Sequence, residues 1–178
     1  AAAQKSTLDY KLTVKEIVEF ASTVAYEDIE FILESRTLNL ALAKEGMKGC
    51  YGLKVGWAIN LDDNREVFGG DFLSYAMSLT AAASDARMAG CTLAAMSNSG
   101  SGNQGITVTM PVIAYSKKYG TDDERLARAL VLSHLIAIHI KGYLGKLSAL
   151  CGCVIASTGS SCGLVYLRGG DYEQICAA

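Results

Sequence analysis

Proline is almost absent from the sequence, which holds one, Pro111, among its 178 residues. Because proline interrupts helices and removes a backbone donor, its scarcity favours long helices. Long apolar runs are also absent, and stretches such as Leu135–Ile138 fall far short of the ~20 residues that a membrane-spanning helix needs. These absences predict an all-α fold without a membrane segment, built as a bundle-like set of helices joined by loops rich in glycine and serine.

Neither sign of charge dominates the chain. Sixteen basic and eighteen acidic residues leave a formal net charge of −2, so nothing indicates the basic surface that nucleic acids require. The apolar region of a signal peptide does not follow Ala1–Lys5. We therefore expect a single helical domain over residues 1–178, cytoplasmic, that binds neither nucleic acid nor membrane.

Six cysteines without a secretory signal are expected to be thiols. Cys50 and Cys91 lie among small residues, where free cysteine usually behaves as a small buried hydrophobe. Cys151 and Cys153 bring two sulfur atoms close together, and Cys162 follows nine residues after the second. Thiolates are the usual ligands of iron–sulfur clusters, yet this spacing matches neither ferredoxins nor zinc fingers. Metal binding, catalysis and burial all stay open.

A polar segment, Ser97–Gly105, interrupts a chain that is 51% hydrophobic. Glycine lets a ligand approach the backbone, and a loop that enters a helix offers unpaired N–H groups at the positive end of the helix dipole. The pattern predicts a site for a small polar ligand, such as a carboxylate, and the alternative is a turn and helix cap that satisfy their own backbone. The candidate ligand-binding residues are Asn98, Ser99, Ser101, Gly102, Asn103 and Gln104.

Apolar spacing and capping patterns predict the helices. A Thr13–Glu16 capping box begins the first helix, and Thr121–Glu124 contains another. The run 55–61 could be a helical turn or a strand, and its residues do not decide; the family resemblance described below favours a helix. Around residues 151–166 we expect two helices separated by a break, and 144–147 reads as a turn. The other predicted helices cover 14–24, 26–48 with a bend near 35–37, 71–89, a segment from about 106 to 119 with Pro111 in its first turn or at a kink, 122–142 and a short one after 171.

Some individual side chains invite either a structural or a functional interpretation. His134 and His139 lie in a helix that is apolar nearly all round, so each is expected to be a hydrogen-bonded core residue; if one is functional, His134 is the weak candidate for proton transfer. Trp57 is expected to be buried. Asp85 and Arg87 are expected on a solvated face, with an approach to the polar segment as the alternative.

Four stretches together resemble the L-serine dehydratase α-chain-like and L-cysteine desulfidase family, most strongly over roughly residues 85–170. The most specific is Ser99-Gly100-Ser101-Gly102-Asn103-Gln104-Gly105. The resemblance implies a helical [4Fe-4S] enzyme that eliminates water or hydrogen sulfide from L-serine or L-cysteine and leaves pyruvate and ammonia. Its expected partner is the small amino-acid substrate, and a homodimer is an open alternative to a single chain. The stretches are 96–112, 133–141, 150–153 and 159–163.

Two parts of the family pattern are missing. No Gly-Cys-Thr-Glu-Pro element is present, since Leu93 and Ala94 follow Gly90-Cys91-Thr92, and no further cluster cysteines follow Cys176. The resemblance therefore implies a fragment that lacks an N-terminal part and the last cluster-ligand segment, with Cys151, or alternatively Cys153, as one ligand. We expect such a fragment to be inactive and to bind no cluster alone. The alternative is a non-catalytic helical module that binds a small polar ligand or a partner through the polar segment.

Overall fold

The computed structural model describes residues 12–69, 71–144 and 151–178. Within these ranges the chain is all-α, which confirms the predicted fold class, and the one β-bridge pairs Asn98 with Ser101. None of the described helices is long and apolar enough to cross a membrane. The elements are α1 (Val14–Thr23), α2 (Tyr26–Ile29), the 3-10 helix η1 (Glu30–Leu33), α3 (Glu34–Gly46), α4 (Val55–Ile59), α5 (Asp62–Val67), α6 (Asp71–Met88), α7 (Gly102–Tyr119), α8 (Asp123–Leu144), α9 (Gly152–Leu167) and α10 (Tyr172–Cys176).

Side-chain caps begin several helices where the sequence predicts them. The Thr13 hydroxyl accepts from the Glu16 N–H, and the Glu16 carboxylate accepts from the Thr13 N–H at 2.9 Å, so the predicted capping box at α1 is confirmed. At α8 the cap is Asp122, whose carboxylate accepts from the Arg125 N–H at 2.8 Å, rather than Thr121. Each cap satisfies a backbone donor that the helix itself leaves unpaired.

The predicted helix over 26–48 is interrupted earlier than expected. The 3-10 helix η1 separates α2 from α3 at Glu30–Leu33, before the predicted bend at 35–37. A 3-10 turn places residues three apart on one face, and Ile29 and Ile32, both buried, are three apart. Because α2 and η1 both contact α8, the tighter turn directs both isoleucines into the core.

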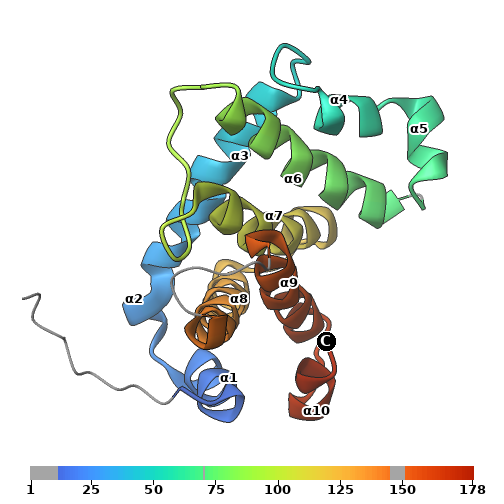
Figure 1. Cartoon of the computed structure of the whole chain (residues 1–178). Coiled ribbons are helices and arrows are strands. Elements are labelled where there is room, and N and C mark those ends of the chain that lie inside the picture. The colour runs from blue at the N-terminus through green and yellow to red at the C-terminus, as the bar shows by residue number, and fades with distance from the viewer. Residues whose placement is uncertain (1–11, 70, 145–150) are drawn as a thin grey trace, which may run out of the picture.

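Helices α7 and α8 form the centre of the molecule (Figure 1). α7 contacts α3, α6, α8 and α9, while α8 contacts α1, α2, η1, α7 and α9. Burial of one such aliphatic side chain contributes about 1.5–3 kcal/mol, so these two helices hold the largest share of the core. The fully buried side chains on them include Ile106, Met110, Ile113, Leu126, Leu130 and Leu132.

Small residues let α3 and α4 approach α6 closely. A Cβ atom on Gly46 would lie 1.9 Å from the Ala82 carbonyl oxygen, and one on Gly56 would lie 2.2 Å from the Ala82 nitrogen. Both distances are far below van der Waals contact, so neither position accommodates a side chain. The small residue Ala82 on α6 therefore lets both helices pack closely against it.

Two helices differ from the prediction. Pro111 lies in the interior of α7 and not in its first turn, and α7 begins at Gly102, four residues before the predicted start. The proline leaves the Thr107 carbonyl without the usual N–H donor four residues on. Residues 152–167 form one continuous helix, α9, instead of two. The glycines that suggested a break are contact points: Cβ atoms on Gly159 and Gly163 would lie 2.4 Å from the Ser133 carbonyl oxygen and 2.2 Å from its hydroxyl.

Two burial predictions in the connector after α3 are wrong. Trp57 is 39% exposed and Cys50 is exposed. Trp57 covers the left-handed turn at Gly49, where a Cβ would lie 3.1 Å from the indole, and the Cys50 thiol donates to the Lys48 carbonyl at 3.5 Å. The run 55–59 is helical, as favoured. The turn predicted at 144–147 lies almost entirely outside the described residues.

Candidate functional site

The polar segment forms a tight hairpin in front of α7. Asn98 and Ser101 exchange both backbone hydrogen bonds, at 3.1 and 2.9 Å. Between them, Ser99 and Gly100 have φ values of 48° and 80°. Positive φ at both central positions is the pattern of a type I′ turn, which glycine adopts freely and serine adopts with strain. The turn that the sequence allowed as an alternative is therefore present.

Ser101 ends the hairpin and begins α7. Its hydroxyl accepts from the Gln104 N–H at 3.3 Å, and its carbonyl accepts from the Gly105 N–H at 3.0 Å. In an α-helix the first N–H groups have no intrahelical acceptor, which leaves those of Gly102 and Asn103 directed away from the helix body. The segment is thus a turn, a cap and a cluster of backbone donors together.

Asn98 joins the hairpin to two helices. This side chain is 3% exposed; its Oδ1 accepts from Gln104 Nε2 at 2.7 Å and from the Ser99 hydroxyl at 2.9 Å. Its Nδ2 donates to the His134 carbonyl at 3.2 Å and lies 2.9 Å from His134 Nδ1. Because a carbonyl can only accept, the amide nitrogen faces His134, and Nδ1 must accept.

His134 is a neutral hydrogen-bond donor in this arrangement. It is 8% exposed, and burial lowers its pKa to about 4, so it carries no charge near neutral pH. With Nδ1 accepting, the proton is on Nε2, which has no hydrogen-bond partner among the described residues. Buried donors are rarely left unpaired in folded proteins. His139 differs: its ring packs edge-on against Tyr143, with the ring centroids 5.1 Å apart.

Arg87 lies at the beginning of α7. Its Nη1 donates to Asn103 Oδ1 at 3.1 Å, and a Cβ on Gly102 would lie 2.2 Å from Arg87 Nε. No carboxylate among the described residues forms an ion pair with it. Cations are unfavourable at a helix N-terminus, whereas anions are favourable there. The solvated face is therefore wrong for Arg87, and the alternative, an approach to the polar segment, is confirmed.

Asp85, predicted on the same solvated face, also has a structural partner. Its Oδ2 accepts from the Gly56 N–H at 3.0 Å, which ties α6 to the first turn of α4.

The two cysteines named as candidate metal ligands lie where α9 begins. Cys151 is the exposed N-cap residue of α9, and the Cys153 sulfur lies 3.9 Å from the Thr107 hydroxyl on α7. A Cβ on Gly152, between them, would lie 3.0 Å from Gln104 Oε1. The structure therefore brings these thiols beside the hairpin and the first turns of α7.

The thiols alone do not complete an iron–sulfur site. Cys162 is buried, burial raises its pKa, and its thiol donates to the Ile175 carbonyl at 3.5 Å. Within the described ranges no three His, Cys, Asp or Glu side chains gather as metal ligands do. A [4Fe-4S] cluster usually takes four thiolates, so Cys151 and Cys153 fit only as part of a ligand set.

An apolar groove of about 440 Å³ adjoins Cys153. It is lined by residues of α4, α6, α7 and α9, and the residues from α7 are Thr107 and Pro111. The sequence did not predict the groove, because its walls come from four separated helices. Among the other lining residues are Val55, Ile59, Phe72, Leu73, Met77 and Leu164.

The fold and the site together define a class of protein. It is an all-α protein in which a polar hairpin and two thiols meet at the start of a central buried helix. The profile of the family described as serine dehydratase alpha chain matches residues 3–178. The chain belongs to this family, and the resemblance inferred from the sequence is confirmed.

Similar proteins are known from several bacteria under the name UPF0597 protein. Those of Oleidesulfovibrio alaskensis and Phocaeicola vulgatus are 53% and 50% identical over 93% and 94% of this chain. That of Bacteroides thetaiotaomicron is 46% identical over 100% of it. The chain spans only 39–42% of the length of these relatives. No solved structure matches the chain.

Proposed function

We propose that the whole protein is a lyase that eliminates water or hydrogen sulfide from L-serine or L-cysteine and releases pyruvate and ammonia. Family membership supports this reaction class. In this proposal the described residues bind the substrate carboxylate. The observation that carries this role is the Arg87 guanidinium beside the first N–H groups of α7.

The carboxylate would lie between Arg87 and the Gly102 and Asn103 N–H groups. A guanidinium presents several donors in one plane, which suits a carboxylate, and the helix N-terminus adds a favourable dipole. The Asn103 side chain holds the guanidinium in place. Gln104 Oε1, close to Gly152, is an acceptor of the kind that a substrate ammonium group needs.

Asn98 and His134 would support this site from the buried side of the hairpin. Asn98 fixes the hairpin through Gln104 and Ser99, so it positions the binding groups. The neutral Nε2–H of His134 can donate a hydrogen bond. Because Nδ1 accepts from Asn98 and Nε2 carries the proton, neither nitrogen is free to remove a proton from the substrate. In this proposal His134 acts through Asn98 and is a positioning residue, and its role as a candidate for proton transfer stays a prediction.

Cys151, or alternatively Cys153, would be one ligand of a [4Fe-4S] cluster in the intact protein. When bound, such a cluster supplies a Lewis acid that polarises the departing hydroxyl or thiol. The other thiolates would come from beyond the residues described here.

Arg87→Gln in the complete gene product tests the binding role. A lost charge-assisted hydrogen bond is worth about 1.5–3 kcal/mol, so we expect KM for L-serine and L-cysteine to rise about tenfold to a hundredfold. Asn103→Ala should raise KM less, since the guanidinium remains. Arg168→Gln, at an exposed arginine after α9, is the matched control. Pyruvate release with an unchanged KM in Arg87→Gln would refute the assignment.

A non-catalytic module that binds a small polar ligand through the same hairpin is the second candidate. The hairpin, the Ser101 cap and Arg87 form a polar arrangement that needs no cluster to bind an anion, and this favours it. Iron and acid-labile sulfide, measured after anaerobic purification of this chain and of the complete protein, separate the two. Cluster in the complete protein supports the lyase; no cluster in either, with ligand binding retained, supports the module.

A further inference from the structure

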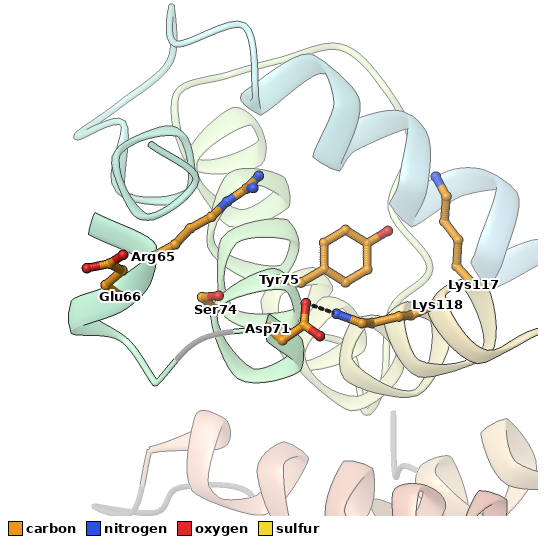
Figure 2. A pocket seen from close by; sticks show the side chains of 7 residues that line it. All are labelled: Arg65, Glu66, Asp71, Ser74, Tyr75, Lys117 and Lys118. Atoms are coloured by element: carbon orange, nitrogen blue, oxygen red, sulfur yellow. Dashed lines mark hydrogen bonds and ion pairs between the residues drawn. The ribbon is translucent and has the colours of Figure 1, made fainter. Parts of the chain in front are cut away.

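A second cavity, of about 490 Å³, lies at the opposite end of α7 from the hairpin. Since α7 has 18 residues, the two sites are about 25 Å apart. The volume is within the range of small-molecule sites. The lining residues come from α5, α6 and α7 and are Arg65, Glu66, Asp71, Ser74, Tyr75, Lys117 and Lys118 (Figure 2).

The charges in this cavity do not cancel. Lys118 Nζ lies 2.5 Å from Asp71 Oδ1, and the Lys118 side chain is 22% exposed. The Asp71 carboxylate therefore compensates the charge of Lys118. The Glu66 carboxylate points away from the other lining side chains in Figure 2. Arg65 and Lys117 are therefore left as cations that no acidic side chain within the cavity compensates.

Both of these cations lie in the last turn of a helix, Lys117 in α7 and Arg65 in α5. Cations complement the helix dipole at this position. Arg65 belongs to α5, which buries no residue. Its Nη2 donates to Asn60 Oδ1 at 2.5 Å, and its Nη1 lies 3.7 Å from Asp62 Oδ1. That pair is exposed and hence weak, so the guanidinium retains donors and charge for a ligand.

A neutral donor lies between the two cations. The Tyr75 hydroxyl projects into the space between Arg65 and Lys117 in Figure 2. Burial raises the pKa of Tyr75 and outweighs the opposing effect of Lys118, so the hydroxyl stays protonated at neutral pH. It can therefore donate to an anion that lies between the cations.

We propose that this cavity binds a phosphate group, free or at the end of a small metabolite, through Arg65, Lys117 and Tyr75. A dianion matches two cations that have no acidic partner inside the cavity, and a phosphate has more oxygens to share among three donors than a carboxylate, which has only two. The guanidinium fork also matches two phosphate oxygens.

Calorimetric titration of the 178-residue chain at constant ionic strength tests this proposal. The probes are inorganic phosphate and glycerol 3-phosphate. We expect saturable binding of at least one probe, with Kd raised about tenfold or more in Arg65→Gln and in Lys117→Gln, and raised less in Tyr75→Phe. Lys15→Gln, on the exposed side of α1, should bind as the unchanged chain does.

The two probes separate the sources of the phosphate. Equal Kd values for the two probes mean that the cavity contacts only the phosphate group. A lower Kd for glycerol 3-phosphate means that the cavity also contacts the organic part. Arg87→Gln locates the site, because binding lost there but retained in Arg65→Gln would place the anion at the other end of α7. That result, or no saturable binding of either probe by correctly folded protein, would overturn the proposal.

Discussion

At the scale of single residues, the amide of Asn98 carries an unusual share of the connections. It satisfies the His134 carbonyl and Nδ1 on one side, and Gln104 and Ser99 on the other. Removal of a buried hydrogen-bond partner costs the desolvation of every group left behind. Loss of the Asn98 side chain would therefore weaken the contacts among the hairpin, α7 and α8 together.

Asn98→Ala tests that statement. We expect a loss of about 2–4 kcal/mol in the free energy of unfolding, because several buried polar groups lose their partner. Urea denaturation measures it. Ser99→Gly is the matched control: it loses one hydrogen bond but relieves the left-handed backbone at φ 48°, so its effect should be small. Equal losses in the two variants would contradict the central role of Asn98.

The depressed pKa of His134 predicts a dependence of stability on pH. The unfolded histidine titrates near 6.5 and the folded one at about 4, so between these values the unfolded state binds the proton and the folded state does not. Stability therefore falls as the pH drops through this window, by up to about 3 kcal/mol in total. Below about pH 4 this contribution changes no further.

His134→Gln should remove this part of the pH dependence, whereas His139→Gln should retain it. Urea denaturation at a series of pH values between 4 and 7 gives the comparison. The same slope in His134→Gln as in the unchanged chain would mean that other groups cause the acid sensitivity.

At the scale of helices, we expect alanine substitutions at two glycines to change stability in opposite directions. Gly46→Ala forces a Cβ to within 1.9 Å of the Ala82 carbonyl oxygen, so α3 and α6 must separate, at a cost of about 1–3 kcal/mol or more. Gly142→Ala in α8 meets nothing within 4 Å and should stabilise the protein by about 0.5–1 kcal/mol. Thermal unfolding of both variants measures the difference, and stabilisation by Gly46→Ala would contradict the packing.

Helix starts could be predicted from the sequence because their contacts are local. Thr13 and Glu16 are three residues apart, so the letters alone contain the capping box. Breaks were harder to predict. The glycines of α9 read as an interruption, since nothing in the letters shows that Ser133 lies against Gly159 and Gly163.

The candidate site could be predicted only in part for the same reason. The hairpin is a continuous string, and its glycines and serines marked it as special. The bond between Asn98 and His134 joins residues 36 positions apart, and Arg87 reaches Asn103 across 16. Such pairs depend on how α6, α7 and α8 pack, which helical periodicity does not specify.

At the scale of the whole molecule, the apolar groove beside Cys153 gathers apolar side chains from several helices at the surface. Leu73 lines it and is 54% exposed, whereas Leu53 is 88% exposed and lies outside it. We expect the native protein to bind 8-anilinonaphthalene-1-sulfonate and to raise its fluorescence. Leu73→Glu should reduce this signal several-fold and Leu53→Glu should not. An equal response in both variants would mean that the dye binds elsewhere.

The unequal burial of α5 and α7 also affects how fast their amide hydrogens exchange with solvent. α7 buries twelve of its eighteen residues, whereas α5 buries none. Amide hydrogens in the middle of α7 can exchange with solvent only when the whole protein unfolds, while those of α5 exchange through local opening. We therefore expect the wall of the second cavity that carries Arg65 to open locally while α7 stays folded, and hydrogen exchange followed by mass spectrometry would show faster exchange in α5 than in α7.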